Sequence, residues 1–350
     1  MELHELGALT GATSEAVIAA SSVLEQPEPL VLRVDGNVTV DPVMLAALRR
    51  APTVVVLVGE PERVPPELVD AVDVALTATP DPPRPWHDAP LEPIVARVAD
   101  QPLASLALAS LLRVSGQLPV WEAVAAEAAT YGMLLGSDAH RGWLAHRPPP
   151  PEHPPGDGRD PVRATYRWDV LFVTLDRPEV HNAVNTALRD RLVEVFDSAG
   201  SAEWIHDIDL RGRGPSFCSG GDIHEFGSVP DGATSHAVRL TRHPGLAVHR
   251  EAKRVTAHIH GHCIGAGIEI PAFAARVVAA PRTQIRLPEL GMGLVPGAGG
   301  TVSLPRRIGR HRTAWLALSG DTIDARTALR WGLVDAVEPK AGWLPSGRRG

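Results

Sequence analysis

The sequence predicts an α/β protein built from two regions, and three observations lead to this prediction. Short apolar runs typical of buried strands alternate with longer alanine- and leucine-rich segments typical of helices. A chain of 350 residues, 44% of them hydrophobic, is long enough for two domains with ample core. A proline-rich stretch at 148–160 predicts an extended linker between region 1–147 and region 161–350.

The first region is expected to begin as a small α/β layer and to continue as helices. Leu30 to Val34 and Thr53 to Gly59 are typical of strands, with a helix expected from Met44 to Arg50 between them. Leu91 to Leu112 predicts helical structure that Pro102 splits in two, and Pro119 to Leu135 predicts a further helix, because proline is tolerated in the first turn.

The second region carries strands and helices around two glycine-rich turns. Strands are expected over 167–175, 255–260, 276–280 and 284–287, and helices over 186–198 and 305–318. This alternation again favours the α/β class.

The first glycine-rich turn lies between Gly261 and Gly267, where three of seven residues are glycine. A helix would lose about 1 kcal/mol per glycine, whereas a sharp turn benefits from positive φ and close backbone approach. Ile268 to Ala275 then predicts the first turns of a buried helix, which would direct N–H groups at one spot that favours negative charge. Glu269 lies in that first turn.

The second glycine-rich turn, Ser216 to Ile223, follows the strand-like run from Ile205 to Leu210. Its paired glycines, Gly220 and Gly221, predict a backbone that approaches a ligand closely. Two such turns could each supply one N–H to a single oxygen atom, which is the arrangement of an oxyanion hole.

The runs FCSGGDI, HGHCIGAGIEI and LPELGMGLVPGAGGT, in this order, resemble motifs of the enoyl-CoA hydratase/isomerase (crotonase) superfamily. Leu175 to Asn185 and Leu318 to Asp335 resemble two further segments of that family, so the similarity covers about Arg163 to Pro339. It implies a crotonase-like ββα spiral core with flanking helices in 161–350, preceded here by an N-terminal α/β extension.

The resemblance also implies which residues form the site. Glu269 and Glu289 stand twenty residues apart, the spacing that in the hydratases brings both carboxyls to one water and the substrate Cα and Cβ. The oxyanion hole would use the backbone N–H groups of Gly221 and Ala266; the family usually has glycine at the latter position, but alanine keeps the N–H. The implied substrate-binding residues are Phe217, Cys218, Gly220, Asp222, Ile223, Gly265, Pro296 and Gly297.

Taken without the resemblance, these residues have ordinary alternatives. Glu289 could cap a helix and Glu269 could pair with a cation. His258, His260 and His262 alternate and could face a zinc ion, but without a fourth ligand we expect no metal. Cys263 could be a nucleophile, although a small buried cysteine is the commoner case.

The implied reaction is syn hydration of a 2-enoyl-CoA to a 3-hydroxyacyl-CoA, or its reverse, with coenzyme A as part of the substrate and no other cofactor. Three alternatives stay open: enoyl-CoA isomerisation with one carboxylate, the cofactor-independent oxygenase branch, and a catalytically degenerate crotonase that acts as an assembly partner. Glutamate at both positions weighs against the oxygenase. The family resemblance further implies a homo-oligomer, a trimer or hexamer.

Composition excludes some partners and compartments. A net charge of −7 gives no reason to expect nucleic acid or an anionic membrane as partner. Two cysteines cannot form a disulfide framework, and no secretion signal or long apolar span is present in the sequence. A cytoplasmic protein is therefore expected.

Helices predicted within 91–147 resemble the closing helices of crotonases, which normally follow the segment that here ends at Asp335. One interpretation is a permuted chain, in which the N-terminal half supplies those helices and Trp121 and Trp143 help to cover the core. The other is an unrelated helical domain with a shortened C-terminus. Residues 1–90 carry no chemical motif of their own.

Overall fold

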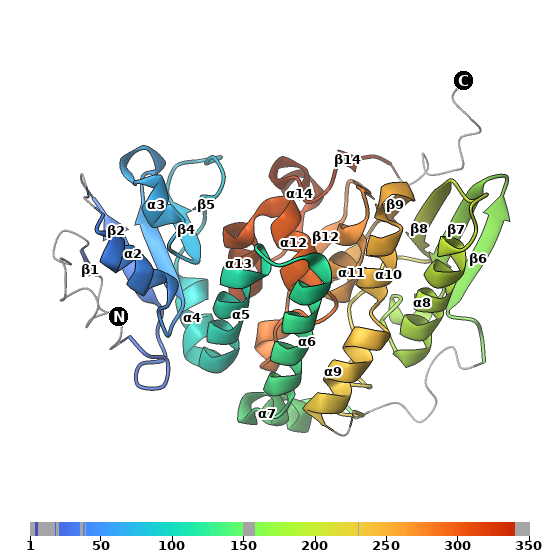
Figure 1. Ribbon diagram of the computed structural model, residues 1–350, viewed down its shortest axis with the longest axis horizontal. Coiled ribbons are helices and arrows are strands. Elements are labelled where there is room, and N and C mark those ends of the chain that lie inside the picture. Colours follow the sequence, from blue (N-terminus) through green and yellow to red (C-terminus); the bar gives the residue numbers. More distant parts are fainter. Residues whose placement is uncertain are drawn as a thin grey trace.

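The computed structural model describes residues 4–5, 18, 21–35, 38, 40–149, 158–229 and 231–339. The α/β class is confirmed, because parallel sheets and helices make up both regions. The N-terminal sheet lies at one end of the molecule and β6 to β8 lie at the other, with helices from both regions packed between them (Figure 1). The linker predicted at 148–160 falls largely outside the described residues.

The N-terminal region is a parallel five-stranded sheet with the order β1-β2-β3-β4-β5. Its strands are His4–Glu5, Leu30–Val34, Val55–Gly59, Val74–Thr77 and His87–Asp88, and its helices are α2 (Pro42–Arg49), the 3₁₀ helix η2 (Pro61–Arg63) and α3 (Pro66–Val69). Near-continuous apolar runs in β3 and β4 are buried, as expected of a parallel sheet covered on both faces.

Four helices follow this sheet: α4 (Glu92–Asp100), α5 (Pro102–Ser115), α6 (Val120–Leu135) and α7 (Asp138–His146). Pro102 begins α5, as the sequence predicts, and the chain bends by 112° between α4 and α5. In the described part of the chain no single helix is long and apolar enough to cross a membrane, although α4 and α5 taken together would meet that length and composition.

The second region contains two sheets. The larger has the order β14-β11-β9-β8-β7-β6, in which only β6 is antiparallel to its neighbour. Its strands are β6 (Val162–Arg167), β7 (Val170–Leu175), β8 (Asp207–Gly212), β9 (Val255–Ile259), β11 (Arg276–Ala279) and β14 (Ala336–Val337). The smaller sheet consists of β10 (His262–Ile264), β12 (Gln284–Arg286) and β13 (Ile323–Asp324).

Helices surround these two sheets. They are α8 (Thr186–Gly200), α9 (Gly232–Thr241), α10 (Pro244–Arg250), α11 (Ala266–Glu269), α12 (Gly300–Ile308), α13 (Arg310–Ser319) and α14 (Ala325–Trp331). Short 3₁₀ helices are η3 (Pro178–Val180), η4 (Ala252–Arg254), η5 (Pro271–Phe273) and η6 (Glu289–Met292).

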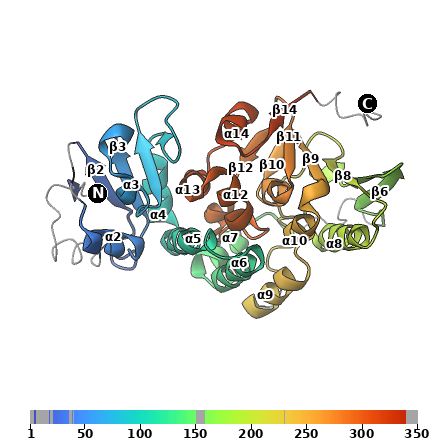
Figure 2. The same ribbon diagram turned by 45° about the horizontal axis from the view of Figure 1, so that its top comes forward.

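Helix α5 of the first region packs directly on α12 and α13 of the second, and α6 packs on α12 and along α9 (Figure 2). Hydrogen bonds join the two regions: Ser115 Oγ donates to the carbonyl of Thr301, and Arg306 donates to the carbonyl of Leu118. One hydrophobic core runs through both sets of helices. The permuted chain remains a prediction, to which this packing gives a physical basis.

Two predicted helices differ from the structure. The helix expected over 305–318 is two helices, because Gly309 at φ +80° breaks it, and the first begins earlier, at Gly300. The helix expected from Ile268 is the single turn α11, since Pro271 has no N–H to continue the helical ladder and the chain changes to η5. A helix this short adds little dipole, so the N–H groups near the site matter individually.

Candidate active site

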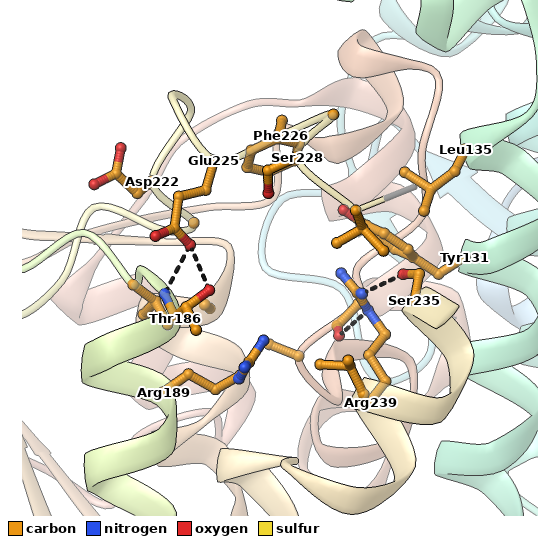
Figure 3. A pocket seen from close by; sticks show the side chains of 18 of the residues that line it. Tyr131, Leu135, Thr186, Arg189, Asp222, Glu225, Phe226, Ser228, Ser235 and Arg239 are labelled. Carbon is orange, nitrogen blue, oxygen red and sulfur yellow. Dashed lines mark hydrogen bonds between the residues drawn. The ribbon is translucent and has the colours of Figure 1, made fainter. Parts of the chain in front are cut away.

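A cavity of about 580 Å³ opens between the two glycine-rich turns and the helices that face them (Figure 3). Thr186 and Arg189 of α8 line one side, and Tyr131 of α6 and Arg239 of α9 line the other. Ala266 and Glu269 of α11, the helix that follows β10, also line it. Both regions of the chain therefore contribute to its wall.

Gly265, directly before α11, lies close to both predicted glutamates. Its φ of +50° and ψ of −121° are accessible to glycine and costly for other residues. A Cβ added there would overlap Glu289 Oε1 and lie 3.6 Å from Glu269 Oε1. The two carboxyl groups therefore converge on one glycine, as the family resemblance implies.

Glu269 is buried, and one of its oxygens is fully engaged by backbone. Its Oε2 accepts the N–H groups of Ala298 and Gly300, both at 2.8 Å. Burial raises the pKa of Glu269 to about 7, although these two hydrogen bonds and the charge of Arg239 act in the opposite direction. Near neutral pH this carboxyl can therefore hold or release a proton.

Glu289, at the start of η6, has a different environment. Its Oε2 is shielded from solvent and has no hydrogen-bond partner in the described part of the chain. Burial, followed by the charge of Glu269, raises the pKa of Glu289 well above its usual range. The surroundings of Glu289 therefore favour its protonated form, whereas the two N–H donors to Glu269 favour the ionised form of that carboxyl.

The two predicted oxyanion donors, Gly221 and Ala266, both line the cavity. Ala266 is the first residue of α11, so its N–H has no intrahelical acceptor. Gly221 is held by its neighbours, because Val184 N donates to Gly220 O and Asp222 N donates to Val184 O. Among the described residues no oxygen accepts either N–H, so both can donate to a substrate.

Asn182 holds the second turn in place from behind. Its side-chain amide donates to the carbonyls of Arg213, Ser216 and Phe217, and its side-chain oxygen accepts from Arg177 N. Gly220 takes a φ of +102°, and Cys218 pairs with Cys263 across a parallel bridge. These contacts fix the direction of the Gly221 N–H.

The predicted substrate-binding residues divide into two groups. Asp222 and Gly297 line the cavity, although the Asp222 carboxylate is already paired with Arg177 at 3.1 Å. The rest do not line it, and instead support its walls: Phe217, Cys218 and Pro296 are buried, Gly220 and Gly265 form the turns, and Ile223 accepts a hydrogen bond from Arg147 through its carbonyl.

The alternating histidines and Cys263 have other contacts in the structure. His258 contacts Asp209 at 2.9 Å and His260 contacts the carbonyl of Gly214, and the described residues contain no group of three potential metal ligands. Cys263 is fully buried, and burial raises the pKa of its thiol well above the usual range, which disfavours the nucleophilic thiolate.

Sequence reasoning missed three residues of the site: Glu127, Tyr131 and Arg239. Glu127 and Tyr131 lie four residues apart on the buried face of α6, and Glu127 is 1% exposed. A glutamate at a core-facing position of an alanine-rich helix is the signal that could have found them. Arg239 lies over the Tyr131 ring and donates to the carbonyl of Gly297 at 3.2 Å.

Comparisons with known proteins agree with the resemblance seen in the motifs. A family model described as Enoyl-CoA hydratase/isomerase matches residues 166–346. The chain is 35% identical over 172 residues to a 2,3-dehydroadipyl-CoA hydratase of Escherichia coli, covering 49% of this chain and 66% of that protein. It is 36% identical over 182 residues to a probable enoyl-CoA hydratase of Rhodobacter capsulatus, covering 50% and 69%.

A solved enoyl-CoA hydratase of Thermoplasma volcanium aligns with a TM-score of 0.49 at 32% identity, over 53% of this chain and 74% of that one. Of the Escherichia coli relative, this chain spans slightly less than two thirds of the full length. The matched part is the second region, and the helices of the first region lie outside it.

Proposed function

Because the chain belongs to the enoyl-CoA hydratase/isomerase family, we propose that it adds water to the double bond of a 2-enoyl-CoA, giving a 3-hydroxyacyl-CoA, or catalyses the reverse reaction. One observation carries the proposal. Two carboxyl groups converge on Gly265, and two backbone N–H groups at the same cavity have no acceptor among the described residues.

The proposed chemistry balances without a cofactor. Glu269 takes a proton from water as the water oxygen bonds to Cβ, and the electrons of the double bond move onto the thioester oxygen. Glu289 then gives its proton to Cα as the carbonyl re-forms. A proton passed from Glu269 back to Glu289 restores the starting state, so the net change is the addition of one water.

The roles follow from the surroundings of each carboxyl. Glu269 is held by two N–H groups, which favour its ionised form and fix its orientation as a base. Glu289 has an oxygen without a hydrogen-bond partner among the described residues and a raised pKa, which suits an acid. Two titratable groups in environments this different are the usual basis for acid and base roles in one site.

The N–H groups of Gly221 and Ala266 are proposed to stabilise the enolate oxygen. One donor of this kind is typically worth about 10²–10³ in rate. The coenzyme A thioester is the proposed partner, and Arg189 and Arg242 at the cavity provide positive charge that suits its phosphate groups. The trimer or hexamer implied by the resemblance stays a prediction.

Purified protein with crotonyl-CoA tests this function through the loss of enone absorbance. We expect hydration by the wild type and a fall in kcat of about 10²–10⁴ in Glu269→Gln and in Glu289→Gln. Glu194→Gln, on the exposed side of α8, is the matched control and should keep wild-type rates. Near wild-type rates in both site variants would refute the mechanism, and turnover of a 3-enoyl-CoA alone would favour the isomerase.

A further inference from the structure

Successive N–H groups at the start of α12 are divided between two carboxylates from opposite regions of the chain. Ala298 and Gly300 donate to Glu269 Oε2. Gly299 donates to Glu127 Oε1 at 2.7 Å, and Thr301 donates to Glu127 Oε2 through both its N–H at 2.9 Å and its hydroxyl at 2.6 Å. The two glutamates therefore bind alternate residues of one loop.

We propose that Glu127 is a positioning residue of this site, which holds Gly299 and Thr301 and thereby sets the orientation of the Glu269 carboxyl. Glu127 does not line the cavity, so it acts through the loop and not on the substrate. The proposal rests on the proposed function only for its kinetic consequence. The statement that Glu127 orders the loop from Ala298 to Thr301 does not depend on which reaction the site catalyses.

The way α12 is capped differs from the way five other helices of the chain are capped. Helices α2, α7, α8, α9 and α14 each take a side-chain oxygen from the residue directly before them. Helix α12 follows Gly299, which has no side chain and a φ of +100°, and its first N–H groups go to Glu127 and Glu269 instead. A local cap would satisfy the same donors, whereas two distant glutamates also fix where Glu269 points.

Burying a second acid beside Glu269 has an energetic cost. Burial, followed by the charge of Glu269, raises the pKa of Glu127 to about 8, and the hydrogen bonds from Thr301 and Gly299 only partly offset this. Glutamine has nearly the same shape but offers one oxygen and one NH₂ group. If the oxygen of the glutamine accepts from Thr301, its NH₂ group faces the Gly299 N–H. Two hydrogen-bond donors then face each other, and the Gly299 N–H loses its acceptor.

Glu127→Gln is therefore expected to disturb the loop while keeping the volume of the side chain. Hydration of crotonyl-CoA should show kcat about 10–100-fold lower, the size expected when a catalytic group is slightly misplaced, with KM changed less than about threefold because no substrate contact is lost. Glu122→Gln makes the same chemical change on the exposed side of α6 and should keep wild-type kinetics.

Hydrogen exchange in the ligand-free protein tests the positioning role without any activity. Exchange should accelerate in Glu127→Gln at Gly299 and Thr301, which lose their acceptor, and also at Ala298 and Gly300, which donate to Glu269. A merely local cap would leave the last two amides protected. Acceleration at all four amides with lowered kcat supports the proposal; protection of Ala298 and Gly300, or an unchanged kcat, overturns it.

Thr301→Val keeps the test decisive if Glu127→Gln does not fold. It removes the hydroxyl donor to Glu127 and leaves α6 untouched. We expect faster exchange at Ala298 and Gly300 and a smaller fall in kcat, and wild-type behaviour in both measurements would overturn the proposal. If the wild type does not hydrate crotonyl-CoA, the proposed function fails, and the exchange pattern still decides whether Glu127 positions the loop.

Discussion

The guanidinium group of Arg239 lies 3.6 Å from the centre of the Tyr131 ring, at the wall of the cavity. It is held there by hydrogen bonds to Ser235 Oγ at 2.6 Å and to the carbonyl of Gly297. Its positive charge lowers the pKa of Glu269, whereas burial raises it. Arg239 therefore helps to keep the proposed base ionised beside Glu127 and Glu289.

Arg239→Gln should move the acid limb of the pH–rate profile to higher pH. Loss of the positive charge disfavours the Glu269 carboxylate, so its pKa rises further above about 7 and more of the base is protonated at a given pH. The loss in kcat/KM should be larger at about pH 6 than at about pH 8. Arg242→Gln removes an exposed arginine at the same cavity, so it should lower kcat/KM by the same factor at both pH values and leave the limb in place. Equal shifts of the limb in both variants would contradict the assignment.

Ala266→Pro should remove one oxyanion donor with little other change. Ala266 is the first residue of α11, a position where proline is tolerated, so the substitution deletes the N–H alone. We expect kcat to fall by about 10²–10³. Ala266→Gly keeps the N–H and should stay close to wild type; equal, small effects of both substitutions would show that this amide does not act on the reaction.

The motifs predicted both the convergence of Glu269 and Glu289 and the two donors, because a short run of sequence builds each glycine turn. The role of Glu127 could not be predicted from the motifs, since its partners Gly299 and Thr301 lie more than 170 residues away in the sequence. Which helix packs beside α12 depends on tertiary contacts that periodicity does not encode.

The boundaries of the elements show the same limit. The sequence predicted a helix from 305 to 318, but α12 begins at Gly300. This earlier start was not predicted, because the residues of the first turn of α12 resemble a glycine loop. Trp121 was expected to cover the core, but it is 56% exposed. Helical spacing alone did not reveal which face of α6 would be buried.

Glu289→Gln should stabilise the protein at alkaline pH. The unfolded chain releases the Glu289 proton near pH 4.3, and the folded chain holds it to much higher pH. Between these values the folded state binds more protons, so the free energy of unfolding falls as pH rises. Glutamine mimics the protonated carboxyl and removes this loss.

Thermal unfolding of wild type and Glu289→Gln across pH measures this effect. The difference in Tm should be close to zero near pH 4 to 5 and should grow in favour of the variant towards about pH 8. A difference in Tm that is independent of pH would show that the Glu289 carboxyl titrates normally in the folded protein.

A fragment of residues 160–350 should be insoluble or inactive, although it keeps Glu269 and Glu289. It lacks the side chains of α4 to α6 that are buried in the shared core, such as Ile94, Leu108 and Val124. Each large apolar side chain contributes roughly 1.5–3 kcal/mol, and a few of them match the stability of a typical domain, about 5–15 kcal/mol.

Adding residues 91–147 as a separate polypeptide should partly restore solubility and hydration of crotonyl-CoA. The same fragment carrying Glu127→Gln should restore solubility better than activity, because α6 would still cover α12 but would no longer hold Gly299. A soluble and fully active 160–350 fragment would show that the first region is an appendage.

The most direct test of the central claim is the stereochemistry of crotonyl-CoA hydration in D₂O. Glu269 and Glu289 both approach Gly265, so they are expected to act on one face of the bound enoyl group. The wild type should therefore add one deuteron at Cα and the hydroxyl at Cβ from the same face, giving a single syn diastereomer of 3-hydroxybutyryl-CoA by NMR. A mixture of diastereomers, an anti product or no product would contradict the two-carboxylate mechanism.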